Sequence, residues 1–133
     1  MCLNNVKDKA PSVAEEDIHC FKVIRDYGVE GGMYSPYMLH GPLVFGDLYK
    51  SRLGRPSFNQ VSEGLHAMLT LESAKRLASY QFTTAFNEIF KTIIVNTIIP
   101  KGSEYYIGNL FTVDEDKVGI VANQMKYIDV CVQ

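Results

Sequence analysis

The chain has 133 residues, of which 47% are hydrophobic and 21% are charged, and its formal net charge is −2 at pH 7. This length and composition fit one globular domain, and the charge excludes an extended basic footprint for duplex nucleic acid. The sequence has no apolar run of the roughly 18 residues that would cross a bilayer. Its polar N-terminus lacks the apolar core of a signal peptide. We therefore expect a cytoplasmic protein without membrane contact.

The N-terminal half predicts an arm followed by short strands. Residues 1–17 are polar and are expected to form a flexible arm, with a single domain over residues 18–133. Turn-forming residues and the extended segment Tyr34–Tyr37 separate two predicted strands, which lie at 18–25 and 43–49. A basic, polar loop at 50–62 follows the second of these strands.

The middle of the chain carries its only strong helical pattern. A short strand at 63–69 leads to Thr70, whose hydroxyl is suited to cap a following helix. From Leu71 to Ile89, apolar residues recur with helical spacing along one stripe. This pattern predicts one main amphipathic helix.

The C-terminal half predicts four strands. The β-branched run from Ile93 to Ile99 is typical of a buried strand, and Pro100 and Gly102 predict the turn that ends it. The next strand contains adjacent tyrosines that must point to opposite faces, because side chains alternate along a strand. Two more strands are predicted at 118–121 and 124–132, joined by a turn at Asn123. The predicted class is therefore α+β, with a mostly antiparallel sheet whose open edges favour a homo-oligomer.

The three cysteines do not indicate a particular function. Cys2, Cys20 and Cys131 have no metal-ligand spacing and predict neither a metal site nor a disulfide framework. Cys2 would become N-terminal after removal of the initiator methionine, and is either a nucleophile or a free thiol. No Walker loop, dinucleotide fingerprint or partnered catalytic set is present, so no cofactor and no catalytic residue are predicted.

The candidate ligand contacts are cationic and aromatic side chains. Arginines, including Arg52 and Arg55, are suited to phosphate, and tyrosines can stack on a base. His66 follows a glycine near the predicted helix N-terminus, where an imidazole can face an anion. Each group also has a structural alternative. These are ordinary surface charge for the cationic residues, core packing for the tyrosines, a hydrogen bond to a neighbouring carbonyl for His66, and turn formation for Asn123. The predicted ligand-binding residues are Arg25, Ser35, Tyr37, His66, Lys101, Tyr105, Tyr106 and Asn123.

Several motifs together resemble a known family. These are the strand start Phe21–Val23, the Ser-Pro-Tyr segment, the Gly-x-His step before the helix, the IPKGSEYYIG hairpin and the Ala-Asn turn. In this order they are similar to a family of short proteins of gut anaerobic bacteria and their phages, over nearly the whole chain from residue 18. The chain departs from the family pattern at Leu65, where an aromatic residue is usual, and at Ala122–Asn123, where the family often has Ala-Ser-Asn.

The resemblance implies a phage context. Small phage proteins without catalytic motifs often counter host defence by binding, and one such mode is the sponge, a homo-oligomer that sequesters a nucleotide immune signal. By this analogy we expect a non-enzymatic protein that binds a small anionic ligand. The alternative is a protein that binds another protein instead of a small molecule. It would inhibit a host factor through a sheet edge or the helix face.

A second, fainter resemblance is to ADP-ribosyltransferase-like folds. The likeness lies in the order of a Ser-Pro strand, a Gly-x-His strand, a helix and a strand-Pro-x-Gly-strand unit. It implies an enzyme that would use Arg25, Ser35 or His66, and the late Glu115. The serine motif is incomplete, and Glu115 lies in a predicted loop.

Overall fold

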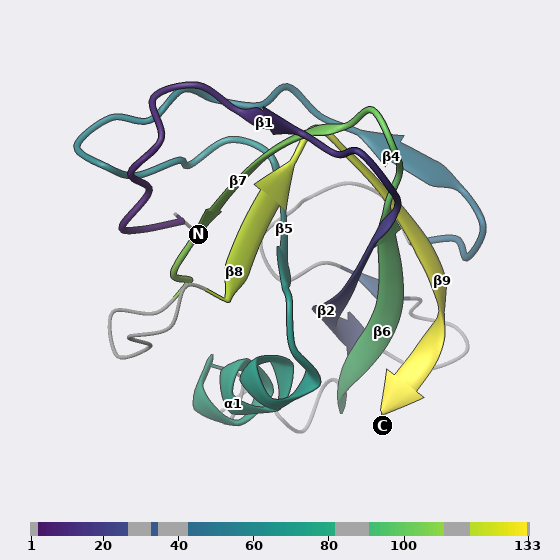
Figure 1. Ribbon diagram of the computed structural model, residues 1–133. Coiled ribbons are helices and arrows are strands. Elements are labelled where there is room, and N and C mark those ends of the chain that lie inside the picture. The colour runs from purple at the N-terminus through teal and green to yellow at the C-terminus, as the bar shows by residue number, and fades with distance from the viewer. Residues whose placement is uncertain (1–2, 27–32, 35–42, 82–90, 111–117, 133) are drawn as a thin grey trace.

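The computed structural model describes residues 3–26, 33–34, 43–81, 91–110 and 118–132. Within these residues, nine strands form one sheet in which all paired neighbours are antiparallel, and a single helix packs against it (Figure 1). The strand order is β1-β7-β8-β5-β2-β6-β9-β4, with β3 paired to β2. The predicted class, a mostly antiparallel sheet with one helix, is confirmed at this level.

The described elements begin and end as follows: β1 Ser12–Val13, β2 Ile18–Asp26, β3 Met33–Tyr34, β4 Leu48–Lys50, β5 Leu65–Met68, α1 Leu71–Gln81, β6 Lys91–Ile99, β7 Glu104–Gly108, β8 Gly119–Ala122 and β9 Gln124–Val132. No helix among these elements is long and apolar enough to pass through a membrane.

The centre of the sheet is the long pair β2 and β6. Their register runs from Ile18 opposite Ile99 to Asp26 opposite Lys91. Ile93, Ile94 and Val95 of β6 are buried, so both faces of the strand are covered there, as its β-branched composition predicts. On the far side of β6, strand β9 continues the sheet with two register shifts, which are β-bulge-type irregularities.

Helix α1 begins where the sequence predicts. The hydroxyl of Thr70 accepts a hydrogen bond from the backbone N–H of Ser73 at 3.2 Å, which caps the helix N-terminus. Ala74 and Leu77 are buried, and the helix packs against β2, β5 and β6. The second half of the predicted helix, after residue 81, lies outside the described residues.

The predicted hairpin between β6 and β7 is present. The carbonyl of Pro100 accepts a hydrogen bond from the N–H of Ser103 at 3.1 Å, and Gly102 has a φ of 88° that suits glycine. Beyond the turn, Tyr105 and Tyr106 point to opposite faces of the sheet and belong to different core clusters. Neither tyrosine is a freely exposed ring, because Tyr106 is buried and Tyr105 is half-buried.

The sheet has a core on each face. The cluster on the α1 face includes Val23, Met68 and Tyr106, together with buried residues of the N-terminal segment. The cluster on the other face includes Ile24 and Tyr127. A sheet that buries both faces explains why its strands read as nearly continuous apolar runs.

Two predictions about the chain are corrected by the structure. The polar N-terminal segment is not a loose arm from residue 3 onward, because Leu3 and Val6 are buried and Leu3 pairs with Val61. The strand predicted at 43–49 is shorter and later, since a turn with Gly46 at a φ of 93° precedes β4. Cys2, Ser35, Tyr37 and Glu115 lie outside the described residues, as do residues 27–32 of the turn-forming segment between the first two predicted strands.

Candidate functional site

A pocket of about 310 Å³ brings together residues from four separate parts of the chain. Tyr106 lies on β7, Asn123 lies in the turn between β8 and β9, and two arginines come from the loop after β4. The full lining is Pro11, Ser51, Arg52, Leu53, Arg55, Glu104, Tyr106 and Asn123. Two of the predicted ligand residues, Tyr106 and Asn123, therefore share a site with the two arginines of the basic loop.

Hydrogen bonds at Asn123 hold the walls of this pocket together. Its side-chain Oδ1 accepts the N–H of Glu104 at 2.9 Å, and its own N–H donates to the Glu104 carbonyl at 3.1 Å. Its carbonyl accepts the N–H of Ser51 at 2.9 Å. Asn123 therefore shapes the turn, as the structural alternative proposed. Its Nδ2 group makes no hydrogen bond within the described residues and is a donor in a side chain that lines the pocket.

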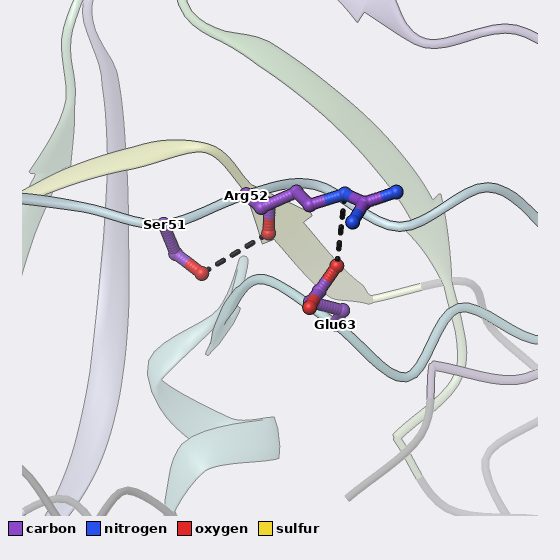
Figure 2. A network of polar contacts seen from close by, with 3 residues as sticks. All are labelled: Ser51, Arg52 and Glu63. Carbon is purple, nitrogen blue, oxygen red and sulfur yellow. Dashed lines mark hydrogen bonds and ion pairs between the residues drawn. The ribbon is translucent and has the colours of Figure 1, made fainter.

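The two arginines give the pocket its cationic side. Arg52 contacts Glu63 through Nε, 3.4 Å from Oε1, and both side chains are largely exposed (Figure 2). Such an exposed ion pair is weak, and only one guanidinium nitrogen takes part in it. Arg55 has no ion-pair partner within the described part of the chain. Together the two arginines leave several N–H donors available to an anion. The lining contains one carboxylate, that of Glu104, so the cationic side chains outnumber the acidic ones.

Tyr106 forms the buried wall of the pocket and is only 2% exposed. Burial raises the pKa of its phenol, Arg55 opposes that rise and Glu104 adds to it. The phenol is therefore protonated at neutral pH and can donate a hydrogen bond.

A second, wider hollow has the opposite charge. It is open to solvent, has a volume of about 940 Å³ and is lined by Ser12, Val13, Ala14, Glu15, Glu16, Asp17, Ile18, His19 and Tyr105. Three carboxylates face this hollow, which disfavours an anionic ligand there. Tyr105 lines it, and Lys101 lies near it because its backbone N–H donates to Asp17 at 2.8 Å. The structure thus places these two predicted residues away from the arginine pocket.

Arg25 and His66 do not line the arginine pocket either. Arg25 lies near the end of β2, opposite Thr92 of β6. His66 lies within β5 opposite Val121, with its Nε2 atom buried and without a partner among the described residues. Burial, and then the nearby Lys22 ammonium, lowers the pKa of His66 to about 4. A neutral, buried imidazole is a weak contact for an anion.

Lys22 is a buried cation that sequence reasoning did not single out. Its side chain is 5% exposed and donates to the carbonyl oxygen of His66. Burial lowers the pKa of Lys22 to about 8, and it raises the pKa of the neighbouring Cys20 thiol to about 12. Its position within an alternating strand, between Cys20 and Ile24, is the signal that could have indicated an inward-facing lysine.

The described residues contain no group of three or more His, Cys, Asp or Glu side chains that could hold a metal ion. Comparison of the chain with protein-family models, with curated proteins and with solved structures finds no match. The arginine pocket is therefore the feature of the molecule that bears most directly on its function.

Proposed function

We propose that this protein is a non-enzymatic binding protein that sequesters a small anionic ligand in the arginine pocket. The observation behind the proposal is the convergence of Arg52, Arg55, the Tyr106 phenol and the Asn123 carboxamide on one pocket. Guanidinium groups bind phosphate with charge-assisted, bidentate hydrogen bonds, and neutral donors fix its orientation. The phage-family resemblance supports a nucleotide immune signal as the ligand and an anti-defence role for the protein.

The size of the pocket narrows the class of ligand. A volume of about 310 Å³ lies at the small end of ligand sites in proteins, which run from roughly 300 to 1,000 Å³. It suits one phosphate with its sugar better than an entire dinucleotide. A larger nucleotide would insert one phosphorylated unit and leave the remainder outside this pocket.

Calorimetry against cyclic mononucleotides, cyclic dinucleotides, ADP-ribose derivatives and inorganic phosphate tests the proposal. We expect at least one nucleotide to bind with a sub-micromolar dissociation constant. Arg55→Gln should weaken that binding by about tenfold or more, because a charged hydrogen bond is lost. Lys75→Gln is the matched control, since Lys75 is an exposed cation of α1 and does not line the pocket.

Two results would contradict the proposal. One is the absence of sub-micromolar binding to every nucleotide in the panel. The other is equal loss of affinity in the Arg55 and Lys75 variants, which would indicate a general charge effect. Incubation with NAD, followed by mass spectrometry of NAD and protein, separates this proposal from a transferase-like enzyme: a binding protein leaves both unchanged.

A further inference from the structure

An exposed phenylalanine lies at the tip of a tight turn between β4 and β5. Ser57 and Gln60 exchange two backbone hydrogen bonds, of 2.8 and 3.0 Å, across Phe58 and Asn59. The side chain of Phe58 is 98% exposed. The turn is also fixed at its base, because the carbonyl of Asn59 accepts the N–H of the buried Val6 at 2.9 Å. The ring is thus presented to solvent on an anchored support.

Phe58 is an unfavourable residue for this backbone. Phe58 and Asn59 have φ values of 51° and 62°, as the two central residues of a type I′ turn require. Asn, Asp and Gly are preferred there, whereas a bulky aromatic residue is strained at positive φ. Both the strain and the exposed ring lower the stability of the isolated chain. A strained residue with an exposed apolar side chain is a candidate for an intermolecular contact.

The charges near the two surfaces are complementary. Arg55 lies three residues before Phe58, is exposed and has no ion-pair partner in the described part of the chain. The open hollow presents the carboxylates of Glu15, Glu16 and Asp17 beside the exposed side chain of Val13. A hollow lined by both acidic and apolar side chains fits an aromatic ring that has a cationic flank.

The two surfaces lie on different parts of the same molecule. The chain between β4 and β5 runs along the top of the view and turns back at the far left, beyond β7, whereas the segment from β1 to β2 runs toward the right (Figure 1). Phe58 is not among the residues that line the hollow. The occupant that matches the hollow is therefore the turn of a second copy.

We propose that the protein assembles with itself by inserting the Phe58 turn of one copy into the acidic hollow of another. Buried aromatic side chains and arginine are the residues that most often dominate such contacts. A reciprocal exchange gives a closed dimer, and a head-to-tail exchange gives a ring or a filament. The contact shares Arg55 with the proposed nucleotide site, but it goes beyond that site, because Phe58 and the acidic hollow do not line the arginine pocket and the measurement contains no nucleotide.

Sedimentation velocity without nucleotide, from low micromolar to several hundred micromolar protein, tests this assembly. We expect the wild-type chain to associate and Phe58→Asn to weaken the association by about tenfold or more. Because Asn suits positive φ, the same variant should unfold at a higher temperature than the wild type under conditions where both are monomeric. Loss of assembly therefore cannot be attributed to loss of folding.

Exchanging the charges of Glu16 and Arg55 tests whether the Phe58 turn of one copy contacts the acidic hollow of another. Glu16→Lys and Arg55→Glu should each weaken the association, and the two changes combined should restore it. Leu48→Thr is the control, since it removes an exposed aliphatic side chain of β4 outside both surfaces. A wild-type chain that is monomeric throughout the concentration range overturns the inference. So does a Phe58→Asn variant that associates as tightly as the wild type, or a combined charge exchange that does not restore association.

Discussion

Two buried titratable side chains, Lys22 and His66, make the stability of this fold dependent on pH. Lys22 donates to the backbone carbonyl of His66, and no carboxylate forms an ion pair with it in the described residues. Both side chains carry their charge less readily in the folded state than in water, because burial removes hydration. Their effects on stability fall in different pH ranges and can be measured separately.

Lys22→Met is expected to stabilise the protein at neutral pH. In the wild-type chain the folded pKa of Lys22 is about 8, below the ordinary value of 10.5. Between these values the unfolded chain binds more protons, so the free energy of unfolding rises with pH. Below pH 8 the folded state retains the full penalty of a buried ammonium, on the order of 3 kcal/mol.

Urea unfolding of the wild-type and Lys22→Met proteins at pH 7 and at pH 9 measures this effect. The advantage of the variant should be largest at pH 7 and smaller at pH 9. The comparison cancels the titration of the tyrosines, which is the same in both proteins. A constant difference across this range would show that Lys22 does not titrate there.

His66→Leu is expected to remove part of the acid sensitivity. The folded pKa of His66 is about 4 against an ordinary value of 6.5, so the imidazole is neutral in the folded state. As pH falls from 6.5 to 4, the unfolded chain takes up the proton and the wild type loses stability, by about 2–3 kcal/mol. Thermal unfolding at pH 7 and at pH 4.5 should show a smaller loss for the variant. Equal losses in both proteins would contradict the assignment.

At the scale of elements, the N-terminal segment is packed through a close approach between backbones. Asn4 and Asn109 exchange backbone hydrogen bonds of 2.6 and 2.7 Å beside Gly108 of β7. A Cβ atom added at Gly108 would collide with the backbone oxygen of Asn4 and press on the side chain of Leu3. The segment can therefore lie on the sheet only because residue 108 is glycine.

Gly108→Ala is expected to lower the free energy of unfolding by about 2–4 kcal/mol and to release the N-terminal segment, because the backbone there must shift. Gly46→Ala is the control. Its φ of 93° is strained for alanine, but nothing lies within 4 Å of the added Cβ, so only about 1 kcal/mol is expected. Limited proteolysis should cleave near residue 10 faster in the Gly108 variant alone. Equal cleavage rates in the two variants would refute the close-approach argument.

The elements that depend on local sequence were predictable, and those that depend on distant pairing were not. Thr70 and Gly102 act within a few residues, so the helix start and the hairpin were found at the right positions. The burial of Leu3 depends on Val61, which is 58 positions later by the difference of their numbers. A polar segment with two isolated aliphatic residues gives no sign of such a partner. Because this pairing is not visible in the sequence, the flexible arm predicted at 1–17 is wrong from residue 3 onward.

At the scale of the whole molecule, the pairing of distant segments forms the arginine pocket. The loop after β4 and the turn before β9 meet at the start of β7, where Asn123 bonds to both Ser51 and Glu104. Tyr106 and Asn123 could be proposed from sequence because of their residue types. The order of the strands decides that Tyr106 and Asn123 lie beside the two arginines, and that Lys101 and Tyr105 lie outside the arginine pocket. The sequence does not reveal that order.

The central claim is that a phosphate-bearing anion binds in the arginine pocket, and amide-proton NMR tests it most directly. Isotope-labelled protein would be titrated with inorganic phosphate and then with ADP-ribose. Saturable shifts are expected at Ser51, Arg55 and Asn123, and they should disappear in an Arg52→Gln/Arg55→Gln double variant. Contradictory results would be no saturable shift at these residues, unchanged shifts in the double variant, or shifts confined to the acidic hollow.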